Sequence, residues 1–255
     1  MTTTHSPQTG AIPTRPAVRA GAAAPATLVA LEVRKSLSTR SGKALAVVSV
    51  LLAPVAGVLA SAASEESLGS VTGPIGAMGM LTALILLSLG VLSTAGEWTH
   101  RTVQTTFLLT PRRGRVLAAK ATAVALLGGA FAAVSAGLTA GVLATMEEGV
   151  SWSGVGGALV AVVASGAAFA VIGAGVGAAL TNTPAALTGL YLVILGALPV
   201  ARTFAPEVGA RLDPAEAVLA LAQGNAVASS VAVLATWTVL ALTAGAVVTS
   251  RRAVA

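Results

Sequence analysis

"GVGGALVAVVASGAAFAVIGAGVGAAL", residues 154–180, decides the fold class, because no charged side chain occurs anywhere along it. A helix needs about 20 apolar residues to cross a membrane, since the hydrocarbon layer is about 30 Å thick and each residue adds about 1.5 Å. The stretch is therefore long and apolar enough for one membrane crossing.

The same pattern recurs along the chain. Charged residues are absent from 44–64, 67–96, 121–146, 149–201 and 217–250. Four of these stretches suit one span each, and 149–201 is interpreted as two spans separated by the turn at 181–184. We predict an all-α integral membrane protein, because the strands of a membrane barrel would alternate polar and apolar residues. The six predicted transmembrane helices lie near 44–63, 75–95, 121–146, 154–180, 185–201 and 226–250.

Composition supports this class. The 255 residues are 55% hydrophobic and 9% charged, whereas soluble domains carry about 25% charged residues. Cysteine is absent and only His5 and His100 could offer imidazole, so we expect no metal site. The phosphate-binding pattern Gly-x-x-x-x-Gly-Lys-Ser/Thr is also missing, which predicts no nucleotide or other cofactor bound by this chain and no enzymatic activity of its own.

Basic residues gather on one side of the predicted membrane. Arg15, Arg19, Arg34, Lys35, Arg40 and Lys43 precede the first span, Arg101, Arg112, Arg113, Arg115 and Lys120 lie between spans two and three, and Arg251 and Arg252 follow the last. Positive charge is retained in the cytoplasm, so we expect both termini and the 96–120 loop to be cytoplasmic.

This distribution also explains the pI of about 11.1 without nucleic acid. We expect the basic side chains at the membrane rim to contact lipid headgroups. Those assigned to the rim are Arg112, Arg113, Arg115 and Lys120. The high alanine content and the excess of Arg over Lys are typical of a GC-rich bacterium, so the expected location is the bacterial plasma membrane.

The N-terminal region divides in two. Residues 1–26 are rich in Thr, Pro and Ala and are expected to form a disordered cytoplasmic tail, and 27–252 form one six-span domain. Within 27–43, Val29, Val33 and Leu37 cluster on one side of a predicted helix, with Glu32 elsewhere. This helix either lies in the headgroup plane or simply extends span one.

The spans are rich in small residues at helical spacing. Small residues at this period allow close helix packing in lipid, although an Ala- and Gly-rich chain also produces such rows by chance. The rows are Gly129, Ala133, Gly137 and Gly141 in span three and Gly166, Ala170, Gly173 and Gly177 in span four.

No Asp, Glu, Lys, Arg or His lies in the interior of a predicted span. Such residues commonly mark ion paths and proton relays, so any transport would need energy from elsewhere. The hydroxyls of Ser135, Thr139, Ser165 and Thr236 are expected to bond to their own helix backbones. A passive channel fits less well, because no charged ring lines the spans.

The most polar stretch beyond the tail is "GEWTHRTVQTTFLLTPRRGRVLAAK", residues 96–120. A helix is predicted from Glu97 to Leu109, with Glu97 and Arg101 paired one turn apart and Pro111 ending it. A bare connector needs only a few residues. The exposed charges combined with Trp98 and Phe107 therefore favour docking on a protein partner. The alternative is that the aromatic rings enter the headgroup layer.

A second short helix is predicted within "RLDPAEAVLALAQGN", residues 211–225. Asp213 occupies the N-cap position, Pro214 follows at N1 and Glu216 stands at N3, while Gly224 ends the helix. The helix is too short to span a membrane and is expected to re-enter or lie on the outer leaflet.

At these residues the chain resembles the permease subunits of ABC-2 type exporters. The resemblance rests on Glu97-Trp98, Arg101-Thr102, Thr105-Thr106, Leu108-Leu109, Pro111-Arg112-Arg113 and Ala119-Lys120, on the 31–43 segment leading into span one, and on six spans with both termini inside. It covers residues 27–252.

The resemblance implies a membrane dimer, either of two copies or of two related permeases. It also implies a separate cytoplasmic ATPase that binds ATP and Mg and docks on a coupling helix. Glu97, Trp98, Arg101, Thr102 and Phe107 would lie in or beside that helix. The alternative is a membrane protein that does not transport, such as an immunity factor or assembly anchor.

Overall fold

The computed structural model describes residues 24–64, 68–99 and 113–252. Over these residues the fold is helical, with a single parallel bridge between Ser70 and Ser151. Arg101, Thr102, Phe107 and Arg112, and most of the predicted coupling helix, lie outside the described residues.

Six helices are long and apolar enough to cross a membrane, which confirms the number and approximate places of the predicted spans. Their bounds are α2 Arg40–Ala63, α3 Thr72–Thr99, α5 Arg113–Met146, α6 Val155–Leu180, the combined helix Thr183–Phe204, and α11 Val227–Arg251. α5 begins at Arg113 instead of near 121, so the charged residues Arg113, Arg115 and Lys120 belong to the helix itself.

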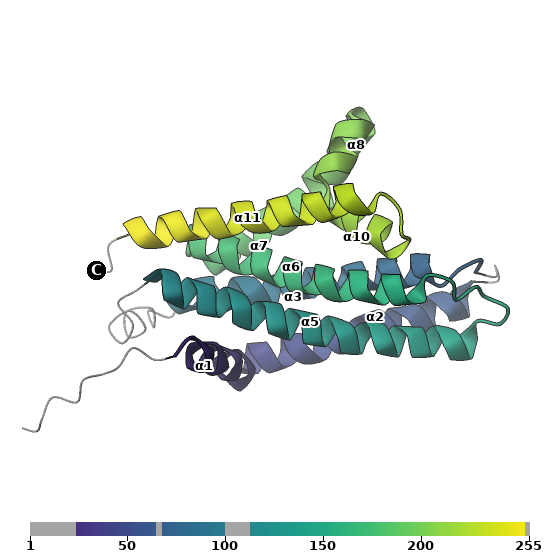
Figure 1. The fold of residues 1–255 in the computed structure, drawn as a ribbon, viewed down its shortest axis with the longest axis horizontal. Coiled ribbons are helices and arrows are strands. Elements are labelled where there is room, and N and C mark those ends of the chain that lie inside the picture. Colours follow the sequence, from purple (N-terminus) through teal and green to yellow (C-terminus); the bar gives the residue numbers. More distant parts are fainter. Residues whose placement is uncertain (1–23, 65–67, 100–112, 253–255) are drawn as a thin grey trace, which may run out of the picture.

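The fifth span is one helix with a wider turn in its middle. It comprises α7 Thr183–Tyr191, the π-helical segment η1 Leu192–Ala197, and α8 Leu198–Phe204. Pro199 has no N–H to bond the carbonyl four residues earlier, which accounts for an irregular turn at this point. The α8 end projects away from the bundle in Figure 1.

The core lies where α3 packs against α6. An added Cβ on Gly90 of α3 would lie 1.9 Å from the Ala170 carbonyl, and one on Gly173 of α6 would lie 2.0 Å from the Leu87 carbonyl. Only glycine permits this approach of two backbones. The row through Gly166 and Gly177 in span four is therefore a true packing surface.

The row in span three behaves differently. Gly137 and Gly141 have open space around them, whereas an added Cβ on Gly129 would lie 3.8 Å from Val163 of α6. The tightest α5 approach to α6 is at Gly128, whose added Cβ would lie 2.7 Å from the Gly166 carbonyl. Within the described chain, the predicted row meets α6 at Gly129 and has open space at Gly137 and Gly141.

The prediction that the hydroxyl groups within the spans bond to their own helix backbones is confirmed for two of the four residues. Thr139 and Thr236 donate to the carbonyls one turn earlier, at 2.9 and 2.7 Å. Ser135 instead bonds Thr82 of α3 at 3.0 Å, and the buried Ser165 hydroxyl has no hydrogen-bond partner within the described chain. Polar side chains thus also connect neighbouring helices.

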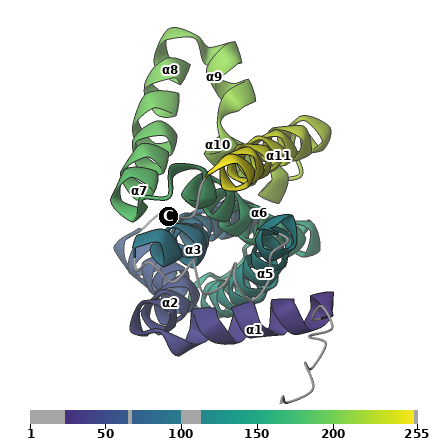
Figure 2. The ribbon, with the colours of Figure 1, turned by 90° about the vertical axis from the view of Figure 1, so that its left-hand side faces the viewer.

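The N-terminal helix is separate from the first span. α1 Pro25–Ser38 ends at Thr39, whose extended backbone breaks the helix and whose Oγ1 accepts from the Gly42 N–H at 3.0 Å to cap α2. α1 crosses the ends of α2 and α5 in Figure 2, and Val33 and Leu37 pack against the bundle core. α1 is therefore not a straight extension of span one.

Two short helices precede the last span. α9 Pro206–Leu212 was not predicted, whereas α10 Pro214–Ala222 agrees with the prediction. Asp213 caps α10 by accepting from the Ala215 and Glu216 N–H groups. Gly224, at φ +73°, ends it in a left-handed turn that glycine adopts readily.

Candidate functional site: a buried charged cluster joining α1, α3 and α5

Four charged side chains from three helices meet at one end of the bundle. We call Glu32 and Lys35 of α1, Glu97 of α3 and Lys120 of α5 the charged cluster. The Lys120 Nζ lies 2.6 Å from Glu32 Oε2 and 2.7 Å from Glu97 Oε1. Lys35 also donates to Glu97 Oε1. The cluster joins α1, α3 and α5.

Burial makes these contacts necessary. Lys120 and Glu97 are only 4% and 6% exposed, and removing a charge from water costs several kcal/mol unless partners compensate. The Lys120 ammonium has three N–H donors and three acceptors nearby, namely the two carboxylates and the Ser93 carbonyl at 3.2 Å.

The position of Glu97 adds a second reason for the lysines. Glu97 stands in the last turn of α3, where the exposed carbonyls of a helix end carry partial negative charge. A carboxylate there is unfavourable without nearby cations. Lys35 and Lys120 supply them from two other helices.

Lys35 lies at the solvent-exposed edge of the cluster, and its side chain is 45% exposed. Partial burial lowers its pKa below the usual 10.5, and the nearby positive charge of Lys120 lowers the pKa further, while Glu32 opposes both. Lys35 therefore holds its positive charge less firmly than an exposed lysine does.

Other contacts tie the same end of the bundle together. The Arg113 guanidinium donates to the Thr249 and Arg252 carbonyls at 3.0 and 2.5 Å, which joins the start of α5 to the end of α11. Arg252 in turn lies over the Trp98 ring at 5.6 Å and donates to Thr181. The helix ends on both sides of 100–112 are thus anchored to α1, α6 and α11.

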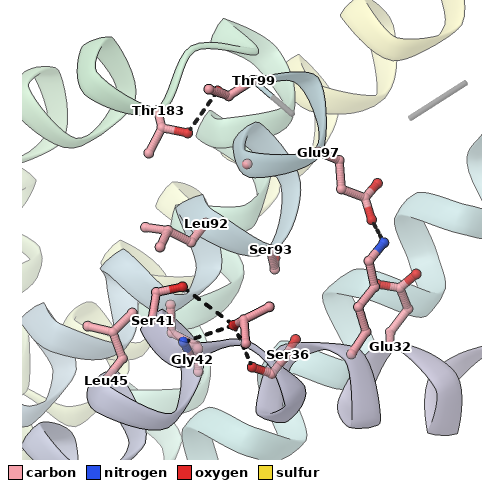
Figure 3. A pocket seen from close by; sticks show the side chains of 14 residues that line it. Glu32, Ser36, Ser41, Gly42, Leu45, Leu92, Ser93, Glu97, Thr99 and Thr183 are labelled. Atoms are coloured by element: carbon pink, nitrogen blue, oxygen red, sulfur yellow. Dashed lines mark hydrogen bonds and ion pairs between the residues drawn. The ribbon is translucent and has the colours of Figure 1, made fainter. Parts of the chain in front are cut away.

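A cavity of about 450 Å³ opens beside the cluster. Figure 3 shows Glu32 and Glu97 on one side and Ser41, Leu45 and Leu92 on another. The cavity therefore has both charged and apolar walls.

The predicted site residues have different outcomes. Glu97 and Trp98 belong to the last turn of α3, whereas a separate helix was predicted to begin at Glu97. Residues 100–109 of that predicted helix lie outside the described residues. The predicted pairing of Glu97 with Arg101 lies outside the described residues, and Glu97 pairs with two lysines instead. Arg115 is exposed on the first turn of α5, where headgroup contact stays a prediction.

Lys120 requires a correction. It was expected to contact lipid headgroups, but its ammonium is buried inside the chain and is held by two carboxylates. Its place in α5, one helical turn beyond Val116, turns it toward α1 and α3. A lysine near the end of a span can be buried when acidic partners meet it.

Asp213 and Glu216 lie at the opposite end of the bundle. Arg202 of α8 contacts Asp213 at 3.4 Å and Glu216 at 3.0 Å. Asp213 is 1% exposed, so it both caps α10 and holds the end of the fifth span against it. These two residues take no part in the charged cluster.

Sequence reasoning missed Glu32 and Lys35. Glu32 was placed away from the inward side of its helix, yet it points to Lys120. Residues three apart in a helix are neighbours, so Glu32 and Lys35 form one polar patch on α1. That spacing beside Val29 and Val33 was the only indication available.

Comparison with known proteins adds no further assignment. No protein-family model matches the chain, and no curated protein matches it.

Proposed function

We propose that this chain is the membrane-spanning permease subunit of an ATP-driven exporter of the ABC-2 type. Its cytoplasmic loop, residues 97–110, docks a separate ATPase subunit, and two permease copies or related permeases form the membrane dimer. The chain hydrolyses nothing itself, and ATP and Mg bind in the partner.

The observation that carries this proposal is the link across the loop. Glu97 precedes the 100–112 segment and Lys120 follows it, and the two side chains lie 2.7 Å apart. A force applied to that loop would therefore reach α3, α5 and, through Glu32 and Lys35, α1 together. A subunit driven mechanically from one end needs such a connection.

The orientation is supported by charge. The described ends that carry Arg34, Lys35, Arg40, Lys43, Arg113, Arg115, Arg251 and Arg252 meet at the cluster end. The opposite end carries Glu147, Glu148, Glu207, Asp213 and Glu216 with Arg202 and Arg211. The cluster end is thus the cytoplasmic end by the positive-inside rule.

The test is co-purification of the chain with an ABC ATPase encoded beside it. Glu97→Arg is a poor probe, because it would place a third cation in the buried cluster. The test variant is Arg101→Glu, which reverses a charge in the predicted docking helix. The control is Arg211→Glu, which reverses the charge of an exposed arginine on α9 at the opposite end of the bundle.

We expect Arg101→Glu to lose the ATPase and its ATP-dependent export, and Arg211→Glu to retain both. If no ATPase co-purifies with the native chain, or if both variants retain the ATPase equally, the proposal that this loop docks it is wrong. The first result would favour a membrane protein that does not transport.

A further inference from the structure

The cavity beside the charged cluster combines features that an amphiphile requires. Its polar wall includes Glu32, Lys35, Ser36, Thr39, Ser41 and Glu97, and its apolar wall includes Leu45, Leu89 and Leu92. Its volume of about 450 Å³ falls within the range of ligand pockets, about 300–1,000 Å³.

The two walls are separated along the axes of α2 and α3. Leu45 lies five residues beyond the start of α2, and Leu92 lies seven before the end of α3. At about 1.5 Å per residue, these side chains stand roughly 8–10 Å inward from the helix ends. A headgroup at the polar wall would therefore place its acyl chain along the leucines.

The polar wall presents both signs of charge. Lys35 uses one of its three N–H donors on Glu97 among the described residues, which leaves donors for an anionic oxygen. Glu32 uses Oε2 on Lys120, and its other oxygen has no hydrogen-bond partner within the described chain. That oxygen can accept from an ammonium group.

We propose that this cavity binds a glycerophospholipid whose headgroup carries a phosphate and a primary ammonium, as phosphatidylethanolamine does. The phosphate accepts from Lys35, the ammonium donates to Glu32, and one acyl chain lies along Leu45 and Leu92. Charge-assisted hydrogen bonds of this kind are roughly twice as strong as neutral ones.

This chemistry discriminates between membrane lipids. A choline headgroup has no N–H to donate to Glu32, and phosphatidylglycerol has no cation at all. The proposal does not depend on the exporter function, because binding is measured on the chain without an ATPase.

The experiment is native mass spectrometry of the purified chain from micelles that contain phosphatidylethanolamine, phosphatidylcholine and phosphatidylglycerol in equal amounts. We expect phosphatidylethanolamine to be retained about fivefold better than either other lipid. Equal retention of phosphatidylcholine, or preferential retention of phosphatidylglycerol, would overturn the proposal.

Two pairs of variants locate the site. Lys35→Met removes the N–H donor to the phosphate. Its control is Lys43→Met, because Lys43 is an exposed lysine on α2. Leu45→Phe fills space at the apolar wall and leaves the charged cluster intact. Its control is Leu51→Phe, because Leu51 is also on α2 but is 47% exposed.

We expect Lys35→Met and Leu45→Phe to lose the preference and both controls to keep it. If Lys35→Met fails to fold, Leu45→Phe decides by itself. If Leu45→Phe retains phosphatidylethanolamine as well as the native chain does, the lipid binds elsewhere. That result would rule out this cavity as the site.

Discussion

Lys120 of α5 and Glu97 of α3 stand 23 positions apart in the chain, and their charged atoms lie 2.7 Å apart in the fold. Between them in the sequence lies most of 97–110, the stretch expected to dock a partner. The pair joins the end of α3 to α5. Because Glu32 binds the same ammonium, α1 is attached to the same point.

Removal of Lys120 is expected to destabilise the fold strongly. Lys120→Met leaves Glu32 and Glu97 without their shared cation, and breaking a buried ion pair costs about 3–5 kcal/mol. The free energy of unfolding in detergent measures the loss. Lys43→Met, an exposed change of the same kind, should lie within about 0.5 kcal/mol of the native chain. Equal stability of the two variants would show that the cluster is not a structural connection.

Helix packing at the core gives a second prediction. Gly173→Ala places a Cβ 2.0 Å from the Leu87 carbonyl and must push α3 away from α6. We expect a loss of about 1–3 kcal/mol or more in the free energy of unfolding, measured in detergent. Gly137→Ala has open space and a better helix former, so it should be neutral or gain up to about 1 kcal/mol. The reverse order of the two variants would contradict this packing.

The cap of α10 can be separated from its ion pair. Asp213→Ala removes both the N-cap bonds and the contact with Arg202, whereas Asp213→Asn keeps a capping oxygen and loses the charge. We expect Asp213→Ala to cost about 0.5–2 kcal/mol more than Asp213→Asn in thermal unfolding. Equal losses would mean that the charge, and not the cap, holds this segment.

Lys35 predicts a pH dependence of stability. Its pKa in the fold is lowered from 10.5 by burial and by Lys120, so between the two pKa values the unfolded chain binds more protons. Stability therefore rises with pH through this alkaline window, and the gain is lost as pH falls through the folded pKa. The other charges facing Lys35 are Glu32 and Glu97.

The measurement is the free energy of unfolding of the native chain and of Lys35→Met as pH approaches 10.5. We expect the native chain to gain relative to the variant over that window. Parallel curves would show that the Lys35 pKa is not lowered. Lys43→Met, which leaves the cluster intact, should follow the native curve.

Topology can be tested on single thiols, because the chain contains no cysteine. Ser38→Cys, at the cluster end, should react with a membrane-impermeant maleimide only after the cells are opened. Ser153→Cys, exposed before α6 at the other end, should react in intact cells. Labelling of denatured protein shows that both thiols are reactive. The opposite pattern would invert the orientation and remove the loop from the cytoplasm.

The local features of the fold were predictable from residues close together in the chain. Asp213, Pro214 and Gly224 define α10 because caps and stops act over a few residues. The π-helical turn before Pro199 and the short helix α9 were missed, since apolar composition does not specify local helix geometry.

By itself, the sequence determined the six apolar helices and the separation of charge between the two ends, because hydrophobic length and charge position are properties of the chain alone. Only the tertiary structure decided that Glu32, Lys35, Glu97 and Lys120 meet, and that Gly128 is the α5 glycine packed most tightly on α6. Such contacts depend on the rotation and crossing of separate helices. One residue of rotation moves a side chain from lipid to the core, and no local pattern specifies that rotation.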